Sequence, residues 1–184
     1  MSFRKWFGRT YLKMRGFTVE GQFPEGVAKS VIISAPHTAI EDFIIGRCFF
    51  WMDGKKVKFL IKKEFFKPVL GWALRKMGGI PVDRSRANNV AANTAALFSQ
   101  YDSLYVVITP EGTRKRVDRW KRGFYYIAEM AHVPVVLGFI DFKTKRCGYG
   151  PSFIPTGDFE KDWTLIEDFY RGMQGKKKGL FNLE

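Results

Sequence analysis

Short apolar runs and longer stretches with helical spacing follow one another along the chain. Val31 to Ala35 is rich in β-branched residues and ends at a proline, which is typical of a buried strand of an α/β sheet. The same pattern predicts further strands at 57–61, 80–82, 104–109 and 133–142. Pro81 cannot donate a hydrogen bond to a neighbouring strand, so the strand that contains it is expected at an edge of the sheet.

Helical patterns occupy the intervals between these strands, at 42–52, 64–77, 87–101 and 123–131. Pro68 and Gly71 are expected to bend or delay the second of these helices. Asp158 could cap a last amphipathic helix that follows it. Because strands alternate with helices, the pattern predicts an α/β fold, a single domain with a mixed, mostly parallel sheet flanked by helices.

The turn after the first strand carries the strongest candidate for chemistry, and residues 36–42 read PHTAIED. Thr38 and Glu41 have the spacing of a capping box, with Thr38 as N-cap and Glu41 at the third helical position. His37 then precedes the cap and Asp42 is the fourth helical residue, two positions that come into contact at helix starts. The spacing predicts a histidine oriented by an aspartate, beyond a strand where open α/β sheets bind ligands. A purely structural His–Asp pair is the alternative.

The first seventeen residues contain five basic side chains and no acidic one. Between the basic residues, aromatic and apolar side chains recur at helical spacing: Phe3, Trp6, Phe7, Tyr11, Met14 and Phe17. This pattern is typical of a helix that lies in a membrane interface, and a helix packed on the protein's own core is an equally open interpretation. We therefore divide the chain into a basic aromatic segment at 1–23, a main domain at 24–175 and a basic tail at 176–184 that is expected to fray.

Charge and cysteine content restrict the classes of function. The chain has 31 Lys and Arg against 18 Asp and Glu, a net charge of +13, which attracts nucleic acid, anionic lipid headgroups or phosphorylated substrates. No apolar run reaches the roughly 18 residues of a membrane span, and no signal peptide is visible, so the protein is expected to lie on a membrane rather than cross it. Cys48 and Cys147 lack metal or redox spacing, so free thiols in a reducing compartment are expected.

Two groups of basic residues also follow predicted strands. Residues 110–116 read PEGTRKR, and the turn at Glu111 and Gly112 could expose backbone N–H groups. Arg114 follows this turn, and Arg84 follows another extended segment. Guanidinium groups bind phosphate oxygens through two parallel hydrogen bonds. A phosphate site beside a general base is therefore preferred over the interpretation that these arginines are solvated surface residues.

These motifs together resemble the glycerolipid acyltransferases, the family of the lysophosphatidate and glycerol-3-phosphate acyltransferases. That family carries four blocks in order: a His and an Asp separated by four residues, a stretch from a glycine to an Asp-Arg pair, a Pro-Glu-Gly-Thr-Arg stretch, and a later proline in an apolar strand. All four occur here in order, as His37 with Asp42, Gly79 through Asp83 and Arg84, Pro110 through Arg114, and Pro134. One block alone would be weak evidence, whereas four in order are highly specific.

The chain also departs from the family pattern. Pro36 and Ala39 stand where the family commonly has an Asn before the His and a Ser two residues after it. The His–Asp pair itself is intact, so the chemistry is expected to survive with different local hydrogen bonding. Many relatives have long N-terminal hydrophobic helices, and the basic aromatic segment of this chain would replace them.

The resemblance implies that His37, with its tautomer fixed by Asp42, takes the proton of an acceptor hydroxyl as that hydroxyl attacks a thioester. It also implies that Glu111, Gly112, Thr113 and Arg114 bind the acceptor's glycerol phosphate, with Arg84 and Lys62 near the same phosphate. No Gly-x-Ser-x-Gly elbow occurs and neither cysteine has a nucleophile setting, so direct transfer without an acyl-enzyme is expected. No metal site is visible, and no cofactor is expected besides acyl-CoA or acyl-carrier protein as co-substrate.

We therefore expect an acyltransferase that moves a fatty acyl group from acyl-CoA or acyl-carrier protein to a lysophospholipid, above all 1-acylglycerol-3-phosphate, in phospholipid synthesis. The expected partners are this acceptor, the acyl donor and an anionic membrane surface, with no nucleic acid. The expected location is cytoplasmic, peripheral on the inner face of the membrane. The alternative is a non-catalytic basic module that binds anionic membrane or RNA, which the charge of +13 and the interleaved aromatic residues would suit.

Overall fold

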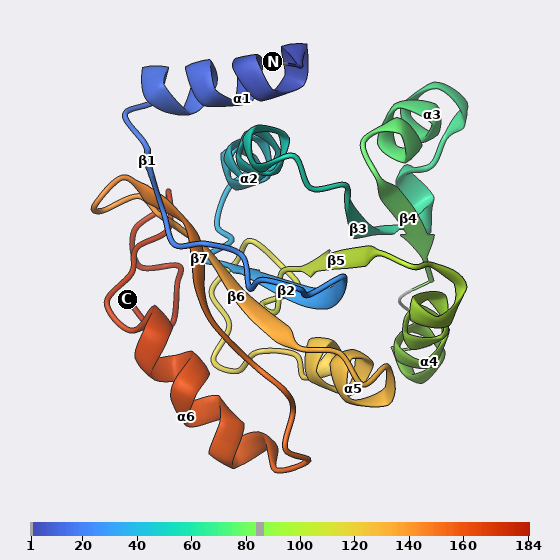
Figure 1. Ribbon diagram of the computed structural model, residues 1–184. Coiled ribbons are helices and arrows are strands. Elements are labelled where there is room, and N and C mark those ends of the chain that lie inside the picture. Colours follow the sequence, from blue (N-terminus) through green and yellow to red (C-terminus); the bar gives the residue numbers. More distant parts are fainter. Residues whose placement is uncertain (1, 84–86) are drawn as a thin grey trace.

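A seven-stranded sheet with helices on both faces forms the part of the chain that the computed structural model describes, residues 2–83 and 87–184 (Figure 1). The strands are β1 (Thr18–Glu20), β2 (Lys29–Ala35), β3 (Val57–Lys62), β4 (Gly79–Val82), β5 (Leu104–Ile108), β6 (Val135–Asp141) and β7 (Arg146–Phe153). The α-helices are α1 (Phe3–Met14), α2 (Ile40–Asp53), α3 (Pro68–Lys76), α4 (Ala87–Leu97), α5 (Gly123–Met130) and α6 (Phe159–Tyr170). Short 3₁₀ turns are η1 (Lys63–Phe65) and η2 (Phe98–Gln100).

The strand order across the sheet is β1-β7-β6-β2-β5-β3-β4. The strands from β6 to β4 are parallel to one another, whereas β7 runs antiparallel to β6 and pairs in parallel with β1. This topology confirms the predicted α/β fold with a mixed, mostly parallel sheet. It also confirms the edge position predicted for the strand of Pro81, because β4 is the last strand of the sheet.

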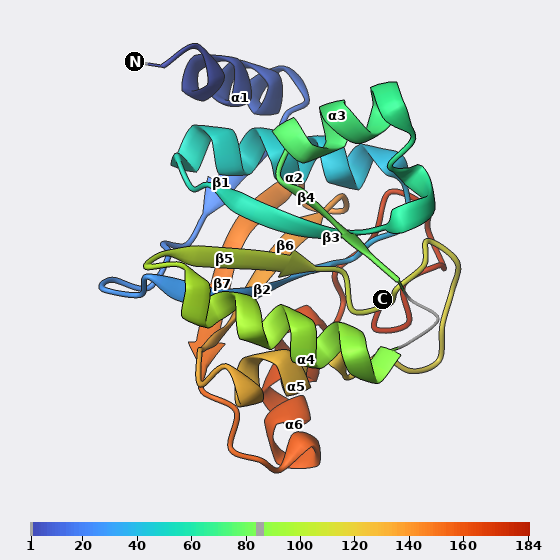
Figure 2. The same cartoon turned by 90° about the vertical axis from the view of Figure 1, so that its right-hand side faces the viewer.

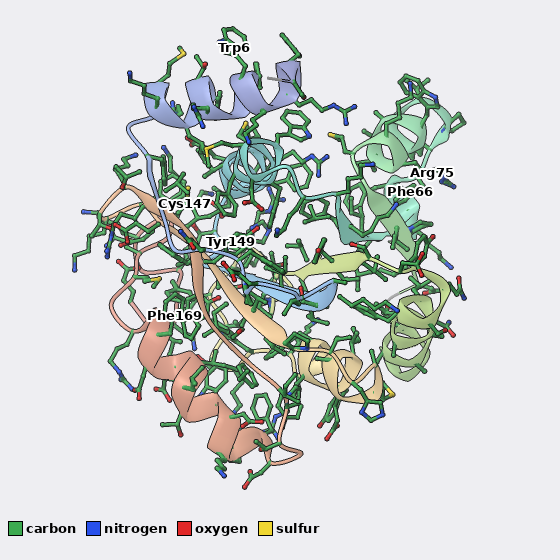
Figure 3. All side chains as sticks on the ribbon, viewed as in Figure 1. Trp6, Phe66, Arg75, Cys147, Tyr149 and Phe169 are labelled. Carbon is green, nitrogen blue, oxygen red and sulfur yellow. The ribbon has the colours of Figure 1, made fainter. Side chains whose placement is uncertain are left out.

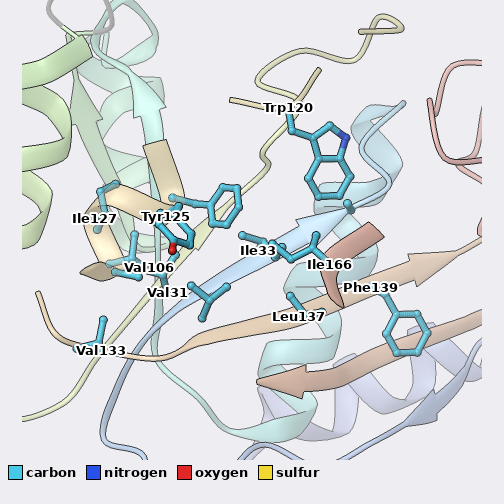
Figure 4. Close-up of a cluster of buried hydrophobic side chains, with 14 of the residues drawn as sticks. Val31, Ile33, Val106, Trp120, Tyr125, Ile127, Val133, Leu137, Phe139 and Ile166 are labelled. Carbon is cyan, nitrogen blue, oxygen red and sulfur yellow. The ribbon is translucent and has the colours of Figure 1, made fainter. Parts of the chain in front are cut away.

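The central strand β2 is buried on both faces. Val31 and Ile33 belong to one buried cluster, and Ile32, which points to the opposite side, belongs to another. Helices α1, α2 and α3 lie on one side of the sheet and α4, α5 and α6 on the other (Figure 1). Figure 4 shows the first cluster, in which Trp120 and Ile166 pack with the strand residues. Because helices cover both faces of β2, apolar residues stand at the successive positions 31–33 instead of alternating with polar ones.

The first helix, α1, uses its two faces differently. Gly8 and Leu12 are buried, and a Cβ at Gly8 would lie 2.3 Å from the carbonyl oxygen of Cys48, so the backbones of α1 and α2 approach closely. On its other face Trp6 is 49% and Met14 is 80% exposed, and Trp6 points away from the molecule in Figure 3. The inner face therefore packs on the protein's own core, and the outer face stays exposed, as a membrane-interface helix would require. No helix within residues 2–83 and 87–184 has the length and apolar character of a membrane span.

Several element boundaries differ from the sequence prediction. The predicted helix at 64–77 divides into η1 and α3, because Pro68 fits the first turn of a helix but not its interior. Strands β1 and β7 were not predicted, since β1 has three residues and β7 contains two glycines and a proline that weaken its pattern. The predicted cap of the last helix is confirmed, because the Asp158 carboxylate accepts hydrogen bonds from the backbone N–H groups of Glu160 and Lys161.

The C-terminal segment, residues 174–184, packs against the domain, so the expectation that the tail frays is wrong. Phe181 is 1% exposed within the larger core cluster. The Arg116 guanidinium donates a hydrogen bond of 2.9 Å to the carbonyl oxygen of Gly179. The buried aromatic ring and these polar contacts hold a segment whose lysines alone would have left it in solvent.

Candidate active site

The residues predicted to do chemistry come together at the carboxyl edge of the parallel strands. Strands β3 and β5 end on the side of the molecule at the right in Figure 2, where the loop after β5 and the C-terminal segment also lie. Strand β2 pairs in parallel with β5, so its last residue, Ala35, leads the chain to the same edge. His37 and Asp42 follow β2, and residues 110–116 follow β5. Open α/β sheets bind their ligands at such an edge.

The start of α2 is organised by the carboxylate of Asp42. Its Oδ2 atom accepts hydrogen bonds from the backbone N–H groups of Thr38 at 2.5 Å and Ala39 at 2.7 Å. Ala39 is the N-cap and Asp42 is the third helical residue, so the predicted cap at Thr38 with Glu41 as its partner is wrong by one residue. The Asp42 carboxylate satisfies these N–H groups itself, whereas Glu41 forms ion pairs with Arg15 and with the C-terminal segment.

The predicted contact between the histidine and the aspartate is confirmed. The Nδ1 atom of His37 lies 3.4 Å from the same Oδ2 atom of Asp42. The His37 side chain is 21% exposed and the Asp42 side chain 3%, so of the two it is the histidine that can meet a substrate. Because Nδ1 faces the carboxylate, Nε2 is the nitrogen that can exchange a proton with a ligand.

Glu111 is a second buried carboxyl group at this edge. It is 4% exposed, and its Oε1 atom accepts a hydrogen bond of 2.8 Å from the backbone N–H of His37. Burial raises the pKa of this carboxyl to about 7, and its Oε2 atom has no hydrogen-bond partner among the described residues. The contact with the acceptor's glycerol phosphate that the sequence predicts would require Glu111 to leave this buried position. Its geometry favours a positioning role for the His37 backbone.

The residue after His37 is held from the other side by the C-terminal segment. Thr38 is 2% exposed, and its Oγ1 atom accepts a hydrogen bond of 3.1 Å from the backbone N–H of Lys177. Gly175 packs so closely that a Cβ there would lie 2.4 Å from the methyl carbon of Thr38. Sequence reasoning missed this role of the tail, and the apolar Phe181 downstream was the available signal that the segment packs.

The remaining predicted residues lie on exposed positions near this edge. Thr113 and Arg114 are exposed on the loop after β5, and Lys62 is exposed at the last position of β3, the strand beside β5. Gly112 precedes Thr113 with a left-handed φ of 67°. The structure thus brings these residues to neighbouring strand ends. Arg84 lies outside the described residues.

Lys121 is a cation at this edge that the sequence analysis did not single out. Its side chain passes over Gly112, where an added Cβ would lie 3.2 Å from the Lys121 Nζ atom. Its backbone N–H donates a hydrogen bond of 2.9 Å to the carbonyl oxygen of Pro110. The positive φ of Gly112 favours glycine at this position, and the flexible end of the Lys121 side chain lies close above it. Lys121 stands in a run of basic residues, so spacing alone did not distinguish it.

This arrangement suits proton transfer beside an anionic substrate. A histidine whose Nδ1 faces a buried carboxylate can accept a proton through Nε2 and is stabilised once it is charged. The exposed cations Arg114, Lys62 and Lys121 favour an anion nearby. Among the residues that the structure describes, no group of three or more His, Cys, Asp or Glu side chains is placed to hold a metal ion.

Comparisons with known proteins identify the family and the fold. The family model described as Acyltransferase matches residues 16–137. Among solved structures, the 1-acyl-sn-glycerophosphate (LPA) acyltransferase PlsC from Thermotoga maritima shares the fold, with a TM-score of 0.65 and 18% sequence identity over 90% of this chain and 74% of that one. No curated protein matches the chain.

Proposed function

Since the chain belongs to the acyltransferase family, we propose that it transfers a fatty acyl group from acyl-CoA or acyl-carrier protein to the hydroxyl of a lysophospholipid, above all 1-acylglycerol-3-phosphate, in phospholipid synthesis. The four motif blocks of the glycerolipid acyltransferases support this choice of acceptor. The observation that carries the proposal is the His37–Asp42 pair, which combines an accessible imidazole with a buried carboxylate fixed by two backbone N–H groups.

In the proposed reaction, the Nε2 atom of His37 accepts the proton of the acceptor hydroxyl as its oxygen attacks the thioester carbonyl carbon. The C–S bond then breaks, and the departing thiolate takes the proton from His37, so that an ester and a free thiol result. The Asp42 carboxylate stabilises the imidazolium that exists between these steps. Base catalysis of this kind contributes a rate acceleration of ~10²–10⁴-fold. Positioning of the substrates and stabilisation of the oxyanion supply the rest of the acceleration.

The acceptor's phosphate is proposed to lie over the loop after β5. Arg114 would bind its oxygens, with Lys62 and Arg84 contributing positive charge and with Gly112 and Thr113 offering backbone and hydroxyl groups. The exposure of Arg114 and Lys62 near the His37 edge supports this role. The reaction as proposed needs no cofactor beyond the acyl thioester itself.

The enzyme is proposed to work on the inner, cytoplasmic face of a membrane as a peripheral protein. The outward face of α1, with exposed aromatic residues between basic ones, supports adsorption to an anionic surface. Basic residues close to such a surface contribute about 1 kcal/mol each. Both substrates of the proposed reaction carry acyl chains, so a protein at the bilayer surface would meet them where they are concentrated.

The test is the release of free thiol from a long-chain acyl-CoA, and in parallel from acyl-carrier protein, with and without 1-acylglycerol-3-phosphate. The matched variants are His37→Asn and His132→Asn, because His132 is the other histidine of the chain and lies at the end of α5. Asn tolerates the left-handed backbone of His132, whose φ is 52°. We expect acceptor-dependent thiol release from the wild type and His132→Asn, and a loss of ~10²–10⁴-fold in His37→Asn.

Two results would contradict the proposal. The first is a protein that binds anionic vesicles but shows no acceptor-dependent release of thiol from either donor. This result would favour a non-catalytic basic module. Full activity of His37→Asn would leave the acyltransferase assignment standing but would remove His37 as the base. The melting temperatures of the variants show whether a loss of activity comes from chemistry or from unfolding.

A further inference from the structure

A buried arginine on α2 has no acceptor for two of its nitrogen atoms. Arg47 is 8% exposed, and its Nε and Nη1 atoms are buried with no hydrogen-bond partner among the described residues. The indole Nε1 of Trp51, one helical turn further along α2, is a third buried donor. It also has no hydrogen-bond partner among the described residues. Folded proteins pair nearly all buried donors, so three unpaired donors on one helix face indicate a missing acceptor.

The surroundings of Arg47 offer ring faces, which attract a cation, and a second positive charge, but among the described residues they offer no hydrogen-bond acceptor for these nitrogen atoms. The guanidinium carbon lies 5.1 Å from the centroid of the Trp51 ring and 5.7 Å from that of Phe59. Burial, together with the positive charge of Arg4 on α1, lowers the pKa of Arg47. No described carboxylate forms an ion pair with it, and a charge buried without a counter-ion is costly. An anion held at this point would satisfy the donors and offset the repulsion between the two arginines.

The protein surface above Arg47 indicates which anion fits. Phe7 of α1 packs edge-on against Trp51 with ring centroids 6.0 Å apart, so the site lies beside the seam between α1 and α2. Helix α1 exposes Phe3 and Trp6 beside this seam. Helix α3, at the same end of the molecule in Figures 1 and 2, exposes Val69, Leu70 and Trp72 at 48–85%. Exposed apolar side chains near a buried cation match a phospholipid, whose phosphate is flanked by acyl chains.

We propose that Arg47 and Trp51 form a binding site for the phosphate oxygens of an anionic membrane phospholipid, with Arg4 adding positive charge at the seam between α1 and α2. The site is separate from the predicted acceptor site, which is built on the loop after β5. It fixes the molecule on the membrane through one lipid headgroup in addition to general adsorption. The proposal does not depend on acyl transfer, so it can be tested on the protein whether or not the reaction is established.

The probe is dihexanoyl phosphatidylglycerol, used as a monomer below its micelle concentration and measured by isothermal titration calorimetry. This phosphodiester is not the product of the proposed reaction, and the Arg47 and Trp51 variants show whether it binds at the new site. Dihexanoyl phosphatidylcholine tests the need for net negative charge, and inorganic phosphate tests whether the acyl chains contribute.

The variants are Arg47→Met, which keeps the volume, Arg47→Lys, which keeps the charge, and Trp51→Phe, which keeps a ring without the N–H. Arg171→Met is the matched control, because it removes the same charge from an exposed position just after α6.

We expect saturable binding of the phosphatidylglycerol by the wild type and Arg171→Met, with an affinity reduced roughly 10- to 100-fold in Arg47→Met, as for the loss of charge-assisted hydrogen bonds. Arg47→Lys and Trp51→Phe should lie between these values. Without lipid, Arg47→Met should melt at a higher temperature than the wild type, because it removes an unpaired buried charge.

Equal affinities of the wild type and Arg47→Met would overturn the proposal. A folded wild-type protein that does not bind the phosphatidylglycerol would overturn it as well. If inorganic phosphate binds as tightly as the phosphatidylglycerol, or the phosphatidylcholine does, the assignment to an anionic lipid is wrong. A lower melting temperature of lipid-free Arg47→Met would show that Arg47 stabilises the lipid-free protein, and the premise of a missing acceptor would be wrong.

Discussion

A single carboxylate oxygen of Asp42 serves both the helix and the histidine. The Oδ2 atom accepts the N–H groups of Thr38 and Ala39 at the start of α2 and also faces Nδ1 of His37. Two short hydrogen bonds from a rigid backbone fix the oxygen, and the imidazole is oriented against it. The carboxylate is therefore preorganised by the fold before any substrate binds, which lowers the cost of reaching the reactive geometry.

The buried carboxyl of Glu111 predicts a specific dependence of stability on pH. Its pKa is raised by burial from 4.5 to about 7. This shift corresponds to a change of roughly 3 kcal/mol in the free energy of unfolding between acid and alkaline pH. The folded state then binds a proton that the unfolded state has lost, so this contribution is fully present below pH 4.5 and is lost as the pH rises through 7. In Glu111→Gln the amide oxygen can still accept the His37 N–H but cannot ionise. Urea unfolding measured from acid to alkaline pH should show the wild type losing stability relative to Glu111→Gln as the pH rises from 4.5 through 7. If the free energies of unfolding of the two proteins change with pH in the same way, the prediction is wrong.

Arg114 should matter only for acceptors that carry a phosphate. Arg114→Ala should raise the Michaelis constant for 1-acylglycerol-3-phosphate strongly, because a charged hydrogen bond contributes ~1.5–3 kcal/mol. Arg114→Lys keeps the charge without the planar fork and should recover part of that loss. Slow hydrolysis of the acyl thioester by water should change far less in both variants, and it serves as the control. Equal losses in the two reactions would place Arg114 in the donor site or in the fold.

At the scale of elements, the C-terminal segment and the start of α2 form one packed unit. Thr38 meets the backbone of Lys177 through its hydroxyl and Gly175 through its methyl group. The stability contribution of Thr38, expected at the sequence level from a helix cap, therefore comes from the tail. A segment beyond the matched family region thus helps to position the residue next to His37.

This packing predicts a coupled pair of substitutions. Gly175→Ala should destabilise the protein by about 1–3 kcal/mol, because its Cβ would lie 2.4 Å from the methyl carbon of Thr38. In Thr38→Ala the nearest remaining atom is Cβ at 3.1 Å, so the same substitution should cost much less there. Denaturant unfolding of both single variants and the double variant gives the interaction energy. Additive free energies of unfolding would show that the two residues do not meet.

An element could be predicted where the residues that determine it are close together in the sequence. The strand at β2 and the cap at Asp158 follow from adjacent residues, and both predictions are confirmed. The cap of α2 was misplaced by one residue, because Glu41 and Asp42 are both suitable partners by spacing. In the structure Asp42 forms the cap, and Glu41 forms ion pairs with distant segments. Strand β7 depends on pairing with β6 and β1 across the sheet, a long-range effect that its own sequence does not reveal.

The same distinction applies to the site. Spacing predicted the His37–Asp42 contact, because both residues belong to one turn and helix. The hydrogen bond from His37 to Glu111 joins residues 74 positions apart, and that from Lys177 to Thr38 joins residues 139 apart, so local patterns could not predict them. The motif blocks indicated that Glu111 belongs to the site, and the fold determined that its carboxyl points inward.

At the scale of the whole molecule, α1 has one face that packs on the domain and one face that is exposed. The inner face cannot be removed without exposing α2, since Gly8 and Leu12 are buried against it. The outer face carries Phe3, Trp6 and Met14 with no comparable burial. Deleting the whole segment would therefore mix two effects, loss of adsorption and loss of packing. Point substitutions on each face can separate them.

The last prediction uses this separation. The triple substitution Phe3→Ser, Trp6→Ser and Met14→Ser should weaken binding to phosphatidylglycerol vesicles, with little change in the free energy of unfolding, because these side chains are exposed in the folded protein. Leu12→Ala should instead cost about 2–5 kcal/mol of stability through a cavity, while the protein that remains folded should bind vesicles as before. Vesicle sedimentation at low and high salt should also show wild-type binding that falls as charges are screened, and a smaller salt effect with phosphatidylcholine. If the triple variant binds vesicles as tightly as the wild type, α1 is a packing element alone and the membrane contact must lie elsewhere on the molecule.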